Sequence, residues 1–300
     1  MRRHHLIASA VLALALLAAA CGDGGGAAGS DGGGAHVVVT TSILGDVVAN
    51  LVGDDARVEV LMPSGADPHE FALSARQAAD LREADLVVAN GGGFEQGFDD
   101  ALEAAEADGA TVARAADAVE LIDGDPHFFN DPARTAVAAE ALAGTLAAEV
   151  PGLDTRAFAA RARAYVAELE SLDAEVEAAL AAVPAEQRKL VTNHDVFAYF
   201  ADRYGFTVVG TVIPAVTTQA EPGAGALDEL AATIEAEGVP AVFADTSSPE
   251  SLADTLAAEV GDIEVVELYT ESLGEPGSDG DTYVAMVRTN ARRIAAALGP

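Results

Sequence analysis

The sequence predicts an α/β protein with two lobes of mostly parallel sheet, flanked by helices and joined by one long helix. Short β-branched strands alternate with helical segments along the chain, which is typical of parallel sheets covered by helices on both faces. One amphipathic segment in the middle is much longer than the others. The body from residue 36 to the end, about 265 residues, is also large for a single hydrophobic core.

The first half of the chain predicts four strands separated by helices. Ser42 follows a β-branched strand and is a suitable N-cap for a helix with one apolar face. Pro63 ends the second strand, and Asp131 followed by Pro132 is a favourable helix start. The expected strands are 36–41, 58–62, 85–89 and 111–113, and the expected helices are 42–52, 74–83, one from about 94, and 132–150.

Residues 154–183 form the most regular segment of the sequence. Apolar side chains recur there at spacings of three and four, which is the period of one helical face. At a rise of 1.5 Å per residue, about 30 residues make a rod of roughly 45 Å. Such a rod is long enough to cross from one lobe to the other. Its apolar positions are Phe158, Ala162, Tyr165, Leu169, Leu172, Val176 and Leu180.

The alternation of strands and helices resumes after Pro184. The expected strands begin at 190 and cover 207–212, 241–244 and 263–268. The expected helices include one around 196–200 and others at 227–237, 249–259 and 281–298. The glycines at 91–93 lack the spacing of a dinucleotide fingerprint, and the chain has no P-loop, so they are interpreted as a tight turn after a strand.

The N-terminus has the pattern of a lipoprotein leader. Residues 1–20 combine two arginines with an apolar run that is short for a bilayer span, which is typical of a secretory signal peptide. Small residues stand directly before Cys21, the only cysteine of the chain, which cannot form an internal disulfide. We therefore expect lipidation at Cys21, anchorage to the outer side of the cell membrane, and a flexible glycine-rich tether over 21–35.

The chain is strongly acidic. It has 49 acidic and 16 basic residues and a formal net charge of −33, which excludes nucleic acid as an expected partner. This acidity is equally consistent with solubility or with adaptation to salt, so it is not evidence for a metal site.

Three of the six histidines share one kind of position. His69, His127 and His194 each lie in a predicted loop, and His69 and His194 follow predicted strands in different halves of the chain. In parallel α/β sheets, ligands bind at loops beyond the carboxyl ends of the strands. Imidazole is the commonest protein ligand for transition metals, and three imidazoles are typical of a zinc site. The spacing alone leaves hydrogen-bonding loop histidines as the alternative.

Four segments of the chain resemble one known family. They are Leu61 to Phe71 with its Pro-His-x-Phe signature, Asp125 to Pro132, His194 to Gly205, and Gly280 to Asn290. Over essentially the whole body, the chain resembles the zinc/manganese solute-binding lipoproteins of ABC importers, the family called cluster A-I or cluster 9.

The resemblance implies a ligand set, a partner and a mechanism. By similarity the metal ligands are His69, His127, His194 and Asp281, with Asp281 also a candidate helix cap. The family implies two lobes, 36–153 and 185–300, joined by a rigid helix over 154–184, in a monomer that delivers its ion to a membrane permease. Asp195 and Glu70 are candidates for orienting the imidazoles. Because ligands must be deprotonated, affinity is expected to fall below about pH 6.

Several alternatives remain open at this stage. Three imidazoles and one carboxylate favour Zn²⁺, whereas Mn²⁺ prefers more oxygen ligands, yet family members with three histidines are similar to proteins that accept manganese. The stretch 118–124 lacks the histidine-rich loop that zinc members often carry. A zinc-dependent hydrolase would use an open coordination position. A chelated-iron or corrinoid binder would need a basic or aromatic cleft, and an adhesin-like role could accompany transport. We expect a binding protein and not an enzyme.

Overall fold

The computed structural model describes residues 34–220, 225–247, 251–261 and 263–300. The predicted leader, Cys21 and all but the end of the tether lie outside these residues. The chain divides into a unit Met1–Gly34 and a compact unit Ala35–Pro300, and everything below concerns the second unit.

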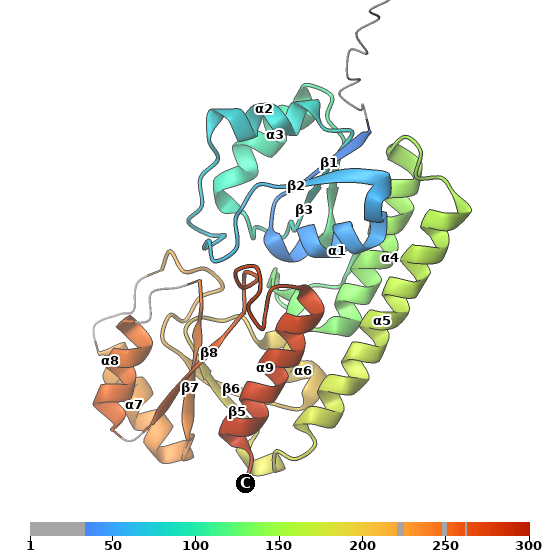
Figure 1. Ribbon diagram of the computed structural model, residues 1–300. Helices are drawn as coiled ribbons and strands as arrows, with labels where there is room; N and C mark the ends of the chain where they lie inside the picture. Colours follow the sequence, from blue (N-terminus) through green and yellow to red (C-terminus); the bar gives the residue numbers. More distant parts are fainter. Residues whose placement is uncertain (1–33, 221–224, 248–250, 262) are drawn as a thin grey trace, which may run out of the picture. The chain divides into compact units, whose positions relative to one another are not determined.

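The first sheet has four parallel strands in the order β2-β1-β3-β4. Val37 and Val39 of β1 face one core with helices α1 and α4, while Val38 faces another core with α2 and α3. Helices therefore cover both faces of this sheet (Figure 1). The elements are β1 (Ala35–Val39), α1 (Ser42–Val52), β2 (Ala56–Val60), α2 (Ala75–Glu83), β3 (Leu86–Ala89), α3 (Asp99–Ala107), β4 (Val112–Arg114) and α4 (Pro132–Glu149).

The second sheet repeats this architecture with the parallel order β6-β5-β7-β8. Val191 and Val242 pack with α7 and α8 on one face, whereas Leu190 and Phe243 belong to the core that contains α6 and α9. The elements are β5 (Lys189–Thr192), α6 (Ala198–Tyr204), β6 (Thr207–Thr211), α7 (Ala226–Glu237), β7 (Ala241–Asp245), α8 (Ser251–Val260), β8 (Glu264–Leu268) and α9 (Tyr283–Leu298). The predicted α/β class with two parallel sheets is confirmed.

Helix α5 (Arg156–Leu180) runs alongside both sheets (Figure 1). All seven positions of the apolar stripe are buried in one core that contains residues of both sheets. At one end Arg161 donates to the carbonyl of Leu51 at 2.8 Å. Further along, the hydroxyl of Tyr204 donates to Asp173 at 2.9 Å, and Arg203 donates to the same carboxylate. The helix is therefore fixed to α1 in the first half and to α6 in the second.

Helix starts differ from the sequence expectation at two positions. The side chain of Thr41, and not that of Ser42, caps α1 by accepting from the backbone N–H of Leu44 at 3.2 Å. Helix α9 begins at Tyr283 with Thr282 as its N-cap, so Asp281 does not cap it. Asp131 caps α4 as expected, with Pro132 in the first turn.

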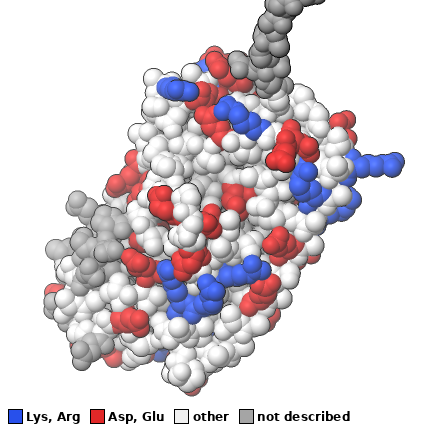
Figure 2. Space-filling view, viewed as in Figure 1, with Lys and Arg blue, Asp and Glu red and all other residues white. Residues whose placement is uncertain are grey.

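The described surface carries many carboxylates. On the face shown in Figure 2 they are spread over both halves of the molecule. Among the described residues, none of the helices combines the length and apolar character that a bilayer span requires.

Candidate metal centre

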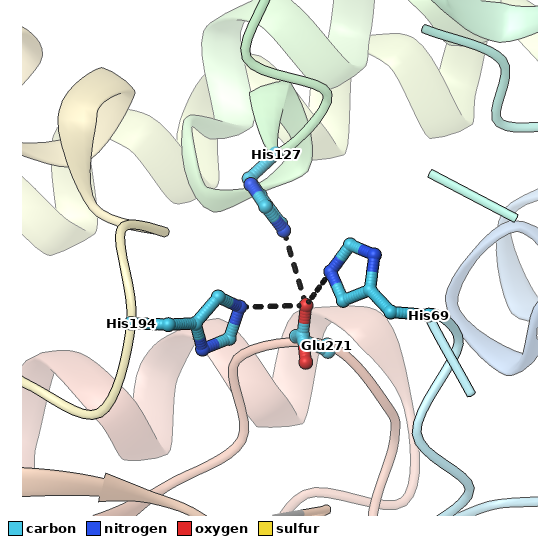
Figure 3. Close-up of side chains that lie close together, drawn as sticks. All are labelled: His69, His127, His194 and Glu271. Carbon is cyan, nitrogen blue, oxygen red and sulfur yellow. Dashed lines mark hydrogen bonds and ion pairs between the residues drawn. The ribbon is translucent and has the colours of Figure 1, made fainter. Parts of the chain in front are cut away.

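The three predicted histidines meet at a single carboxylate oxygen. The Nε2 atoms of His69, His127 and His194 lie 2.8, 3.0 and 3.0 Å from Oε1 of Glu271. All four side chains are buried, and their donor atoms lie within 4.8 Å of one another. Figure 3 shows the three imidazoles converging on Glu271 from three sides. They come from separate loops of both halves, so only the folded chain creates the cluster.

Each histidine loop is shaped by a neighbouring polar side chain. The carboxylate of Asp67 accepts from the backbone N–H of His69 at 2.9 Å, which turns the loop that follows β2. Asp125 accepts in the same way from the backbone N–H of His127 at 2.8 Å. On the other side of the centre, the hydroxyl of Thr192 donates to the carbonyl of His194 at 2.8 Å.

Glu271, and not Asp281, stands with the histidines. Asp281 is partly exposed, and its carboxylate accepts from the backbone N–H of Gly277 at 2.9 Å. Glu271 lies beside the histidines just after β8 ends. The loop that follows is closed by a hydrogen bond from Gly274 N–H to the carbonyl of Gly280 at 2.9 Å. The loop therefore carries Asp281 to another position before α9 begins.

The sequence contained a signal for Glu271. It is the first acidic residue after the strand that ends at Leu268, the same kind of position that singles out His69 and His194. The similarity between Gly280 to Asn290 and a family segment directed attention to Asp281 instead.

One imidazole is oriented by a second carboxylate. Nδ1 of His127 lies 2.6 Å from Oδ1 of Asp125. A neutral His127 that donates from Nδ1 to Asp125 presents the lone pair of Nε2 to the centre, as a metal ligand must. Glu70 and Asp195 were the residues expected to orient the imidazoles. Glu70 is exposed, and the backbone N–H of Asp195 donates to the carbonyl of Ala215 at 3.0 Å.

Protons or a cation must lie between the imidazoles and Glu271. Burial would raise the pKa of Glu271, but the charge of His194 and hydrogen bonds from the three imidazoles hold that pKa well below its usual range. Burial would lower the pKa of His127, but hydrogen bonds to Asp125 and Glu271 outweigh it and raise the pKa to about 9. Because lone pairs of neutral imidazoles cannot bond to a carboxylate oxygen, either protons or a cation must lie between them.

Several buried atoms of the centre have no hydrogen-bond partner within the described part of the chain. They are Nδ1 of His69, Nδ1 of His194 and Oε2 of Glu271. Nitrogen donors from three imidazoles with one carboxylate are a set that suits a divalent transition metal, and Zn²⁺ in particular. The residues therefore fit such an ion as cargo, with the second oxygen of Glu271 available as a further donor.

Aromatic rings and a buried carboxylate surround the centre. The ring of Phe94 lies 5.3 Å from that of His69 and 5.4 Å from that of His127. The next residue, Glu95, is buried and accepts from the backbone N–H groups of Asn90 and Gly91 at 2.6 and 3.1 Å. Gly91 has a φ of 77°, so the tight turn expected at 91–93 is present and places Phe94 against the imidazoles.

Another buried carboxylate supports the Glu271 loop. Asp245, at the end of β7, accepts from the hydroxyl of Thr270, the residue before Glu271. Burial and the nearby charge of Glu271 raise the pKa of Asp245 to about 6.

Comparisons with known proteins relate the chain to metal-binding proteins. A model of the family described as "ZnuA: Zinc-uptake complex component A periplasmic" matches residues 37–297. The zinc-binding protein TroA of Treponema pallidum is 33% identical over 268 residues, covering 85% of this chain and 86% of that protein. The manganese-binding lipoprotein MntA of Bacillus subtilis is 30% identical over 271 residues, covering 86% of this chain and 88% of that protein.

A solved structure has the same fold. The periplasmic zinc-binding protein TroA from Treponema pallidum superposes with a TM-score of 0.83 at 32% sequence identity, covering 89% of this chain and all of that one. The similarity extends through both sheets and the connecting helix.

Proposed function

The chain belongs to the ZnuA family of periplasmic zinc-uptake components, and on this premise we propose that it captures a divalent transition-metal ion outside the cytoplasm and delivers it to the permease of an ABC importer. We propose Zn²⁺ as the preferred ion. The observation that carries the proposal is the convergence of three buried Nε2 atoms on Oε1 of Glu271. The proposed ligands are His69, His127, His194 and Glu271.

The donor atoms favour zinc. Three imidazole nitrogens and one carboxylate oxygen match a closed four-coordinate zinc site, with expected Zn–N distances of about 2.0–2.1 Å. Glu271 takes the place in this set that the sequence analysis assigned to Asp281. The four residues come from loops of both sheets, so an ion would connect the two halves of the molecule.

Manganese is the second candidate cargo, and one observation favours it. Oε2 of Glu271 is buried and has no hydrogen-bond partner among the described residues, so this carboxylate has a second oxygen to offer. Mn²⁺ prefers oxygen ligands and higher coordination numbers than zinc. The names of related proteins include both metals.

Family membership also separates this chain from the enzymatic alternative. The family model describes an uptake component and not a hydrolase, so the chain is a binding protein. The centre supports this assignment, because all four side chains are fully shielded from solvent and a hydrolase would need an open position for water.

The anchoring of the protein is a further part of the proposal. Residues 1–20 would be removed, Cys21 would carry lipid, and residues 21–35 would tether a monomeric body with lobes 36–153 and 185–300 joined by 154–184. The pattern of small residues before Cys21 supports this, and some relatives are named as lipoproteins. Labelling of growing cells with a fatty-acid analogue should mark the chain, and a Cys21→Ala variant should stay unlabelled and leave the membrane fraction.

Metal binding is tested directly on the purified full-length protein. After stripping and reloading, it should hold one Zn²⁺ per chain, and competition with a chromophoric chelator should report the affinity for Zn²⁺ and Mn²⁺. Manganese held as well as zinc would keep the transport role and remove the zinc assignment. The absence of stoichiometric metal would reject the proposed function.

A further inference from the structure

One short segment connects the loops of two proposed ligands that belong to opposite halves of the molecule. It is Ile213–Gln219, which follows β6 and is named the clasp here. It starts beside the His194 loop and ends beside the His69 loop. The inference below rests on the proposed function, because it concerns the ion that those histidines hold.

The first end of the clasp is joined to the His194 loop by backbone hydrogen bonds. Ile213 N–H donates to the carbonyl of Asn193 at 2.7 Å, and Asp195 N–H donates to the carbonyl of Ala215 at 3.0 Å. Just before the clasp, Val212 N–H donates to Thr192 at 2.9 Å. These bonds continue the pairing of β5 with β6, so this end moves with the second sheet.

The other end of the clasp is joined to the His69 loop by side chains. The hydroxyl of Thr218 donates to Oδ2 of Asp67 at 2.7 Å, and the side-chain amide of Gln219 donates to the carbonyl of His69. Oδ1 of Asp67 accepts from the backbone N–H of His69 at 2.9 Å. The Asp67 carboxylate is therefore shared between the clasp and the turn that presents the imidazole.

The two ends differ in how firmly they are held. Ile213 is buried, whereas Thr218 is only partly buried, Gln219 is exposed and Val216 between them is 40% exposed. The hydrogen bonds of Thr218 and Gln219 are only partly buried, and segments held by such bonds open locally at lower free-energy cost than buried ones. The end at Thr218 and Gln219 should therefore open first, while the end at Ile213 stays closed.

We propose that the clasp controls release of the bound ion, with Thr218 and Gln219 as positioning residues that hold the His69 turn in its ligating position. When both side-chain bonds break, the turn loses the donor to Asp67 Oδ2 and the donor to the His69 carbonyl together. His69 then withdraws from the centre while the backbone pairing of the His194 loop is kept. This permits an ion to leave through a local movement without separation of the two sheets.

The test measures release rates in Thr218→Val, Gln219→Met and the double variant of the full-length protein. Each substitution keeps the approximate size of the side chain and removes its donor. Zinc release into excess chelator, followed by stopped-flow absorbance, should become about ten-fold faster or more in the double variant. Hydrogen exchange at the backbone N–H of His69 should rise in the metal-free double variant. The absorption spectrum of bound Co²⁺ and the one-to-one stoichiometry should stay unchanged.

A matched control lies on the same half of the molecule. The hydroxyl of Thr233 on α7 donates to the carbonyl of Glu229 at 2.9 Å, away from the clasp. Thr233→Val should change neither the rate of zinc release nor the rate of hydrogen exchange at His69. Unchanged release in the double variant would overturn the proposal, and so would an altered Co²⁺ spectrum, since the variants would then act on the ligands directly. A wild-type protein that binds no metal would reject the proposed function and the release role with it, whereas the exchange measurement would still report whether the clasp holds the His69 turn.

Discussion

Asp125 and His127 form a carboxylate–imidazole pair in which Oδ1 of the first lies 2.6 Å from Nδ1 of the second. The corresponding Nδ1 atoms of His69 and His194 have no hydrogen-bond partner within the described part of the chain. The three proposed histidine ligands are therefore not equivalent. His127 is held in a single orientation before an ion arrives, whereas the other two depend on their backbone loops.

Asp125→Asn should weaken metal binding. Loss of a carboxylate that orients a ligating imidazole typically lowers metal affinity about 10–100-fold, because the carboxylate fixes the orientation of the ring and makes it a stronger base. Competition titration with a chelator measures the change, and Asp117→Asn, at an exposed position, is the matched control. An affinity equal to that of the wild type would show that Asp125 does not orient His127 in solution.

Glu271→Gln and Asp281→Asn should differ sharply. Glu271→Gln keeps the length of the side chain but removes its charge, so affinity should fall by at least about 100-fold, more than the loss of an orienting partner causes. Asp281→Asn should leave affinity within about two-fold, because the Asn oxygen can still accept from Gly277 N–H. The reverse order of effects would restore Asp281 as the ligand and reject the geometry of the centre.

Metal affinity should rise with pH. The pKa of His127 is raised to about 9, so at neutral pH an arriving ion must displace a proton from this imidazole. Apparent affinity should increase about ten-fold per pH unit between roughly pH 6.5 and 9 and then level off. Isothermal titration in buffers of different ionisation enthalpy should detect the released proton. A flat profile over this range would contradict the protonated state of His127.

The stability of the metal-free protein should fall over the same pH range. The pKa of His127 in the folded protein, about 9, lies above the unfolded value of about 6.5. Its contribution to the free energy of unfolding is therefore complete below pH 6.5 and is lost as pH rises through 9, with an upper limit on the order of 3 kcal/mol. Urea unfolding at several pH values measures this, and Asp125→Asn should flatten the trend.

Bound metal should reverse that trend. An ion that binds only the folded chain raises its free energy of unfolding, and the increase grows with the ratio of free ion concentration to Kd. The increase is about 2.7 kcal/mol when the free ion concentration is a hundred times Kd. Because affinity rises with pH, the increase in melting temperature on adding Zn²⁺ should be larger at pH 8 than at pH 6.5. Glu271→Gln should show little increase at either pH, and calorimetry of loaded and stripped protein provides the comparison.

Much of the fold was predictable because it depends on local periodicity. The apolar stripe from Phe158 to Leu180 sets the length and buried face of α5 through side-chain spacing alone. Buried runs such as Leu86–Ala89 are strands that need apolar residues on both faces, and they are recognisable without knowledge of their partners. The helix start at Asp131 and Pro132 depends only on adjacent residues, and it was predicted correctly.

The histidines of the centre could also be predicted from the sequence, since each follows or precedes a recognisable strand or helix. Glu271 and Asp125 were not identified. The role of Glu271 depends on the path of the loop after β8, where the ring of Tyr269 lies so close to Gly280 that a Cβ atom there would clash. This packing, together with the bond between Gly274 and Gly280, folds the loop back and carries Asp281 elsewhere.

Residue type and spacing along the chain were sufficient to predict the α/β alternation, the long helix, the three histidines and the family resemblance. Only the folded chain showed which carboxylate joins the histidines and that the clasp joins the His69 and His194 loops. The physical reason is distance along the chain: the contact between His69 and Glu271 spans 202 residues, and no local pattern encodes the loop paths that close it.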